Sequence, residues 1–170
     1  MEKFVIDIVD LYWIDGEKEN PEDLCLHGEV NVTIGGKTIA ENYDCTVSST
    51  ALYLLKSIKE DHLINNSSNQ MLPCCGHFII PNDDDTVEIT GCDTGIDWDI
   101  IHEGNFVKLV TEDKKETLID IDEYTKVVFD FADKIEAFYK SCKEKVLPKD
   151  DFDREGYMKF WKEWNNRRHM

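Results

Sequence analysis

An alternating run of apolar residues that ends in two glycines most constrains how this chain can fold. Because successive side chains of a strand point to opposite faces, the apolar residues of this run fall on one face. These residues are Leu24, Leu26, Val30, Val32 and Ile34. Gly35 and Gly36 join the run to a second one that reaches Cys45, and glycines can take the positive φ angles of a tight hairpin. The pattern predicts an antiparallel β-hairpin with one buried face.

The remaining segments predict further strands and three helices. Strands are expected at residues 4–13, at 78–80 and in four segments between 86 and 121; a helix capped by Ser48 or Ser49 is expected over residues 50–63. A long helix from Asp122 carries one apolar stripe, formed by Tyr124, Val127, Val128, Phe131, Ile135, Phe138 and Cys142. We therefore expect a single α+β domain over residues 1–170, with a largely antiparallel sheet of about seven strands, one helix inserted midway and two helices at the C-terminus.

The charge of the chain is strongly acidic and unevenly placed. The net charge is −17, and residues 1–120 hold 25 acids and 8 bases, whereas residues 121–170 hold 11 of each. The segment 60–107 has ten acids and neither lysine nor arginine. Such a segment repels phosphates, so neither nucleic acid nor an anionic membrane is expected as a direct partner.

The location and redox state of the protein are also expectations from the sequence. No segment approaches the ~18 consecutive apolar residues of a membrane span, and the N-terminus shows no basic leader followed by an apolar run. We therefore expect a cytoplasmic protein, in which the six cysteines are reduced.

Acidic side chains around aromatic residues in the same segment predict a surface for a basic protein partner. In such a surface the charges steer the encounter and a buried aromatic anchor supplies affinity. The predicted partner-binding residues are Asp83, Asp84, Asp85, Asp93, Asp97, Asp99 and Glu103, with Trp98 as the anchor. No residue is predicted to be catalytic in this interpretation, and no cofactor is expected.

Two enzymatic or metal-binding alternatives stay open. Cys74 and His77 have a spacing that suits zinc, and Cys92 and His102 complete a tetrahedral set if two strands bring them together. That set would make the chain a zinc-binding protein or a hydrolase. Asp93 begins an Asp-Thr-Gly triplet that resembles the active-site loop of aspartic peptidases, and this resemblance implies a dimer in which two such aspartates share a proton.

The final helix, expected over residues 151–168, is rich in aromatic residues. Phe152, Tyr157, Phe160, Trp161 and Trp164 cover more than one narrow stripe of it. Large residues of this kind close the core of a small domain, and this is the favoured interpretation. The alternative is that some of them are exposed, in which case the helix is a docking element or a homodimer surface.

Four segments carry a resemblance to other proteins. The segments LPCCGHFIIP, GCDTGIDWDIIHEG, FADKIEAFYKSC and FDREGYMKFWKEW resemble a group of small acidic uncharacterised bacterial proteins over residues 72–164. In size, acidity and lack of a catalytic signature the chain is also similar in type to the immunity proteins that neutralise bacterial toxins. This likeness implies a cytosolic inhibitor that uses acidic side chains against a basic toxin, often a nuclease, and it assigns a role to no particular residue.

Overall fold

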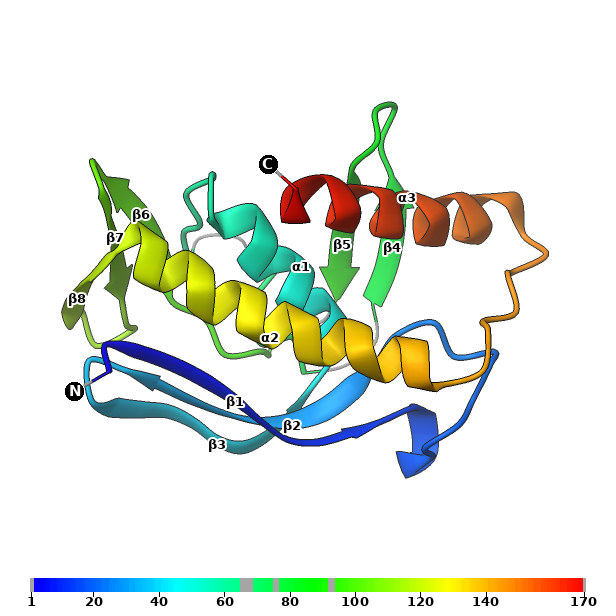
Figure 1. The fold of residues 1–170 in the computed structure, drawn as a ribbon, viewed down its shortest axis with the longest axis horizontal. Coiled ribbons are helices and arrows are strands. Elements are labelled where there is room, and N and C mark those ends of the chain that lie inside the picture. The colour runs from blue at the N-terminus through cyan, green and yellow to red at the C-terminus, as the bar shows by residue number, and fades with distance from the viewer. Residues whose placement is uncertain (1, 65–68, 75–76, 92–93, 170) are drawn as a thin grey trace.

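The structure is a computed structural model that describes residues 2–64, 69–74, 77–91 and 94–169 (Figure 1). Its elements follow the chain as β1 (Phe4–Tyr12), β2 (His27–Ile34), β3 (Lys37–Cys45), α1 (Val47–Ser57), β4 (His77–Pro81), β5 (Val87–Gly91), β6 (Asp99–Glu103), β7 (Phe106–Val110), β8 (Glu116–Asp120), α2 (Ile121–Ser141) and α3 (Asp151–Arg168). A short 3-10 turn, Ile14–Gly16, follows β1. The expected α+β class and the order of strands and helices are confirmed.

The strands of the described residues form three antiparallel sheets, not the one sheet that the sequence predicts. Their orders are β1-β2-β3, β4-β5 and β6-β7-β8. The chain between β5 and β6 explains the division, because Ile96 pairs with Leu72 in an isolated bridge before β6 begins. β6 then pairs with β7 and not with β5.

The predicted hairpin is confirmed as β2 and β3. Val30, Val32 and Ile34 are fully buried, and Gly35 and Gly36 have φ angles of 57° and 76°. Gly35 also has no room for a side chain, since a Cβ there would lie 2.3 Å from the hydroxyl oxygen of Thr117. The hairpin turn therefore packs closely against β8.

The long helix α2 runs beside the β1-β2-β3 sheet and packs against β1 and α1 (Figure 1). Its buried face consists of Tyr124, Val128, Phe131, Ala132 and Ile135, largely the predicted stripe. The helix begins at Ile121, one residue before the predicted start at Asp122, and its cap is Asp120, whose carboxylate accepts a hydrogen bond from the Asp122 amide. Asp122 instead lies in the first turn, where an acid favours the helix dipole.

The cap predicted for α1 is wrong for a different reason. Ser48 and Ser49 are buried inside the first turn, and the helix begins after Thr46. The Ser48 hydroxyl accepts a hydrogen bond from the amide of Leu26 at 3.1 Å. Ser48 therefore joins α1 to the residue that precedes β2, a role that local sequence does not specify.

Helix α3 packs on the β4-β5 hairpin, and its aromatic residues mostly belong to the core. Tyr157, Phe160 and Trp164 are buried, Trp161 is half-buried and Phe152 is exposed. The core interpretation of this helix is confirmed for those three residues, whereas its use as a docking or dimer surface stays a prediction. In the part of the chain that the structure describes, no helix combines the length and apolarity needed to cross a bilayer.

Gly156 brings α3 into contact with the backbone of β4. A Cβ at this position would lie 2.2 Å from the carbonyl oxygen of Ile79. Replacing a glycine inside a helix with alanine normally stabilises the helix by about 1 kcal/mol. Here we expect the opposite sign: Gly156→Ala should lower the free energy of unfolding by about 1–3 kcal/mol, because α3 must move away from the sheet.

Urea denaturation of Gly156→Ala measures this effect. The matched control is Asn165→Ala, at an exposed position of the same helix; it should leave stability unchanged or raise it slightly. Stabilisation of Gly156→Ala to the extent of the control would show that α3 does not make this close approach.

Candidate functional site

A pocket of about 410 Å³, called here the α1 pocket, lies beside the C-terminal turn of α1. Its wall comes from three parts of the chain, residues 53–62, residues 69–71 and residues 82–89, and most of its lining side chains are polar or charged. Because these parts meet only in the folded chain, no local motif indicates the pocket.

Three donor side chains that line the pocket are used within the protein. The Tyr53 hydroxyl donates to the carbonyl of Ile89 at 2.8 Å, and burial raises the pKa of Tyr53, so it remains a neutral donor. Lys56 Nζ donates to the carbonyl of Val87 at 2.6 Å. Ser57 Oγ donates to the carbonyl of Leu54 at 2.7 Å. These groups have little left to offer a ligand.

The acceptors of the pocket, in contrast, stay open. Glu88 is exposed, and although its backbone belongs to the β4-β5 hairpin, its carboxylate has no hydrogen bond or ion pair among the described residues. Asn69 Oδ1 is buried and has no hydrogen-bond partner among them. Glu60 and Asp61 each use one carboxylate oxygen, toward Arg167 and His102 respectively. Since buried polar groups normally have partners, the pocket suits a ligand that donates several hydrogen bonds.

Asp61 is held in its charged form by His102. His102 Nδ1 lies 2.7 Å from Asp61 Oδ1, and the His102 amide donates to the same oxygen at 2.9 Å. These hydrogen bonds lower the pKa of Asp61. The other ring nitrogen, Nε2, lies 3.1 Å from the carbonyl oxygen of Ile58. Both ring nitrogens of His102 therefore face acceptor oxygens, which fixes the orientation of the ring beside Asp61.

His62 and Asp97 form the inner support of the pocket. His62 Nε2 lies 2.8 Å from Asp97 Oδ1, which also accepts hydrogen bonds from the amides of Met71 and Trp98 at 3.1 and 3.0 Å. Asp97 is only 5% exposed. Its carboxylate therefore holds the pocket wall to the start of β6.

Two of the predicted partner-binding residues are not on the surface. Asp97 is engaged in the interior, and Trp98 is 0% exposed, so the prediction of Trp98 as a surface anchor is wrong. Trp98 packs near Phe4, with 6.1 Å between the ring centroids. The physical reason is that Trp98 precedes β6 and is turned toward the core by the hydrogen bonds of Asp97.

The other predicted acids are placed in several ways. Residues 83–85 are exposed in the loop between β4 and β5, which projects at the top of Figure 1; Asp85 pairs with Lys162 at 2.7 Å. Asp99 is half-buried and accepts from the amide of Ile64 at 2.7 Å. Glu103 is exposed and pairs with Lys108. Asp93, the residue of the peptidase-like alternative, lies outside the described residues.

The four residues of the zinc alternative are not brought together within the described chain. Cys74 is disulfide-bonded, so the expectation of reduced thiols is wrong for this residue, although Cys25, Cys45 and Cys142 are free. His102 is occupied by Asp61, as above. Cys92 is outside the described residues, as is the side chain of His77. Among the described residues no three or more histidine, cysteine, aspartate or glutamate side chains are arranged to hold a metal ion.

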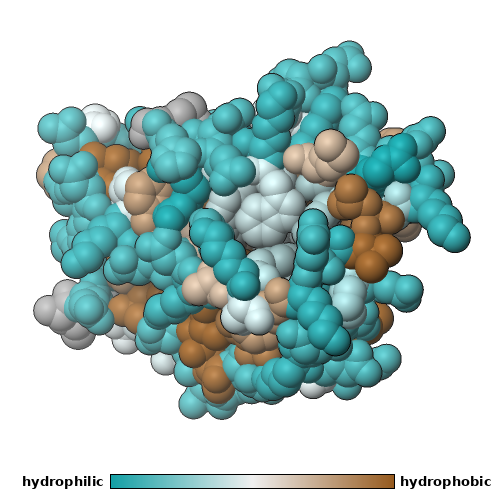
Figure 2. Space-filling view, turned by 45° about the vertical axis from the view of Figure 1, so that its right-hand side comes forward, coloured by the Kyte–Doolittle hydropathy of each residue, from teal (hydrophilic) through white to brown (hydrophobic). Residues whose placement is uncertain are grey.

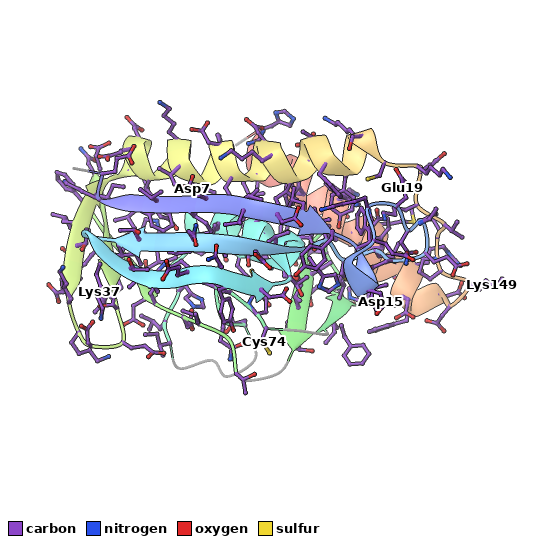
Figure 3. The ribbon with its side chains drawn as sticks, turned by 90° about the horizontal axis from the view of Figure 1, so that it is seen from below. Asp7, Asp15, Glu19, Lys37, Cys74 and Lys149 are labelled. Carbon is purple, nitrogen blue, oxygen red and sulfur yellow. The ribbon has the colours of Figure 1, made fainter. Side chains whose placement is uncertain are left out.

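A second acidic surface was missed in the sequence. Among the described residues, no helix lies over the outer face of the β1-β2-β3 sheet, which is toward the viewer in Figure 3, and Asp7 lies at this sheet. Asp10, Glu29 and Asp44 lie opposite one another across the three strands. The alternation of β2 contained the signal, because Glu29 falls between buried positions, but the register across strands is not readable from one sequence.

Comparison with known proteins gives no family for this chain. No protein-family model, no curated protein and no solved structure matches it. The site must therefore be interpreted from its own geometry.

Proposed function

We propose that the protein is a non-enzymatic binding protein for a basic protein partner, and that the α1 pocket receives an arginine or lysine side chain of that partner. The observation that carries this proposal is the imbalance of the pocket, in which three donor side chains are used internally while the Glu88 carboxylate and Asn69 Oδ1 stay open among the described residues. A guanidinium group offers five donors in a plane and meets this need best.

The charge of the chain supports the same proposal. The net charge of −17 attracts a basic partner over a distance, and the exposed acids of residues 83–85 and of the β1-β2-β3 sheet extend the attraction beyond the pocket. An immunity-type inhibitor of a basic toxin is the particular form of this activity that the resemblance implies. In either form, the acidic charge would mainly set the rate of association, and the contacts in the pocket would mainly set the lifetime of the complex.

A peptide with one arginine in a neutral sequence tests the proposal. We expect it to bind in a calorimetric titration, and we expect a peptide with citrulline in place of arginine to bind about tenfold more weakly or not at all, because citrulline lacks the charge. Added salt should weaken the binding of the arginine peptide and leave the binding of the citrulline peptide unchanged.

Glu88→Gln locates the binding in the pocket. This change removes the negative charge of a carboxylate that has no side-chain partner among the described residues. We expect it to weaken the binding of the arginine peptide about tenfold. The control Glu41→Gln removes the same charge from an exposed position of β3 that does not line the pocket. Equal effects of the two variants would show that only net charge matters, and equal affinity for the two peptides would overturn the proposal.

A further inference from the structure

An aromatic cleft of about 420 Å³ lies on another side of the molecule, between the end of α2, the linker after it and the middle of α3. Tyr139, Tyr157 and Trp161 supply its aromatic wall and Leu147 adds an apolar contact. Figure 2 turns this side of the molecule forward and shows pale side chains recessed between hydrophilic ones. The cleft shares no residue with the α1 pocket.

The rings of the aromatic wall contact one another, and one of them is also hydrogen-bonded to the backbone. Trp161 stands nearly perpendicular to Tyr139, at 85° with 4.8 Å between centroids, and nearly perpendicular to Tyr157, at 87° and 6.4 Å. The Tyr139 hydroxyl is fixed, since it donates to the carbonyl of Leu24 at 2.7 Å and accepts from the amide of Leu26 at 3.2 Å. Because these rings already contact one another, a flat aromatic ligand would lie against their cleft-facing surfaces, by stacked or edge contacts, and not between them.

The charges around the cleft favour an anionic ligand. Three lysines line it against two carboxylates, Glu136 and Glu144. Lys140 pairs with Glu136 at 2.5 Å, and Lys145 donates to the carbonyl of Asn20 at 2.7 Å. The Lys143 ammonium is exposed and has no side-chain partner among the described residues. The lining thus carries one more cation than carboxylates, in a chain whose net charge is −17.

We infer that the aromatic cleft is a binding site for a small planar aromatic molecule that carries an anionic group, with its rings against Trp161 and its charge at Lys143. This site goes beyond the proposed recognition of a basic partner and does not depend on it. The two sites would take ligands of opposite charge.

A pair of fluorescent probes with the same ring system tests the inference. The probes are 8-anilinonaphthalene-1-sulfonate and its neutral analogue N-phenyl-1-naphthylamine, titrated into the whole protein. We expect the sulfonate to bind at one site per chain, about tenfold more tightly than the neutral analogue. Lys143→Gln should lower the affinity for the sulfonate by about threefold to tenfold and leave the affinity for the neutral probe unchanged.

A matched pair of variants places the probe in the cleft. Asn165 lines the cleft and Asn166 does not, and both are exposed on α3. We expect Asn165→Trp to fill the cleft and abolish binding of the sulfonate, whereas Asn166→Trp leaves it unchanged. Unchanged binding to Asn165→Trp, several equivalent sites per chain, or equal affinity for the two probes would each overturn the inference.

Discussion

Replacing Glu163 with alanine is expected to lower the free energy of unfolding by about 3–5 kcal/mol, because it removes the acceptor of buried cations. Glu163 lies on α3 and is 2% exposed. Its carboxylate accepts from Arg167 Nε and from the amide of Val87, both at 2.8 Å, and lies 3.4 Å from Lys56 Nζ. Without it, the buried amide of Val87 loses its partner, and Arg167 and Lys56 lose their shared carboxylate while keeping Glu60 and the carbonyl of Val87 respectively.

Two companion variants separate this network from ordinary surface charge. Glu163→Gln keeps an oxygen acceptor and should therefore lower the free energy of unfolding by less than Glu163→Ala does. Glu155→Ala removes an exposed acid of the same helix that pairs with Lys159, and should change stability by no more than about 0.5 kcal/mol. Urea denaturation measures all three; a midpoint for Glu163→Ala equal to that of Glu155→Ala would contradict the buried network.

The same network links the stability of the fold to the shape of the α1 pocket. Arg167 reaches from Glu163 to Glu60, which lines the pocket, and Lys56 lines it as well. Helix α3 thus holds both a wall and a charged rim of the pocket in place. For this reason the arginine-peptide titration uses Glu88→Gln, which leaves the network intact, and not a change at Glu60 or Lys56.

The elements of the fold were predictable wherever local periodicity reflects burial. The alternation that ends at Ile34 and the stripe that runs from Tyr124 both describe faces that the structure buries. The failures occur where a tertiary contact overrides a local preference. Ser48 has the chemistry of a helix cap, yet its hydroxyl serves the amide of Leu26. The division into three sheets depends on the bridge between Leu72 and Ile96, which no local pattern encodes.

The candidate site was less predictable than the fold, because its residues are defined by distant partners. Asp97 and Asp85 look alike in the sequence, but only Asp97 meets His62, the amide of Met71 and the core. A single sequence shows which residues are acidic and not which of them are buried. The acidic segment was therefore visible in the sequence, whereas Asp97 and its neighbour Trp98 were predicted to be on the surface and are buried.

Trp98 provides the sharpest test of that correction. Trp98→Ala is expected to lower the free energy of unfolding by about 3–5 kcal/mol, because it leaves a large cavity beside Phe4. An exposed anchor for a partner would give the opposite pattern, with unchanged stability and weaker binding. Urea denaturation of the free protein therefore distinguishes a core tryptophan from a surface one before any partner is known.

Trp98→Phe adds a second expectation that depends on the indole nitrogen. Trp98 Nε1 is buried and has no hydrogen-bond partner among the described residues. Phenylalanine removes this unsatisfied donor as well as part of the ring, so the two effects oppose each other and the net loss should be about 1–2 kcal/mol. A loss as large as that of Trp98→Ala would mean that the nitrogen has a partner after all. If Trp98→Ala is as stable as the parent, Trp98 is not a core residue, and the prediction that it anchors a basic partner stands again.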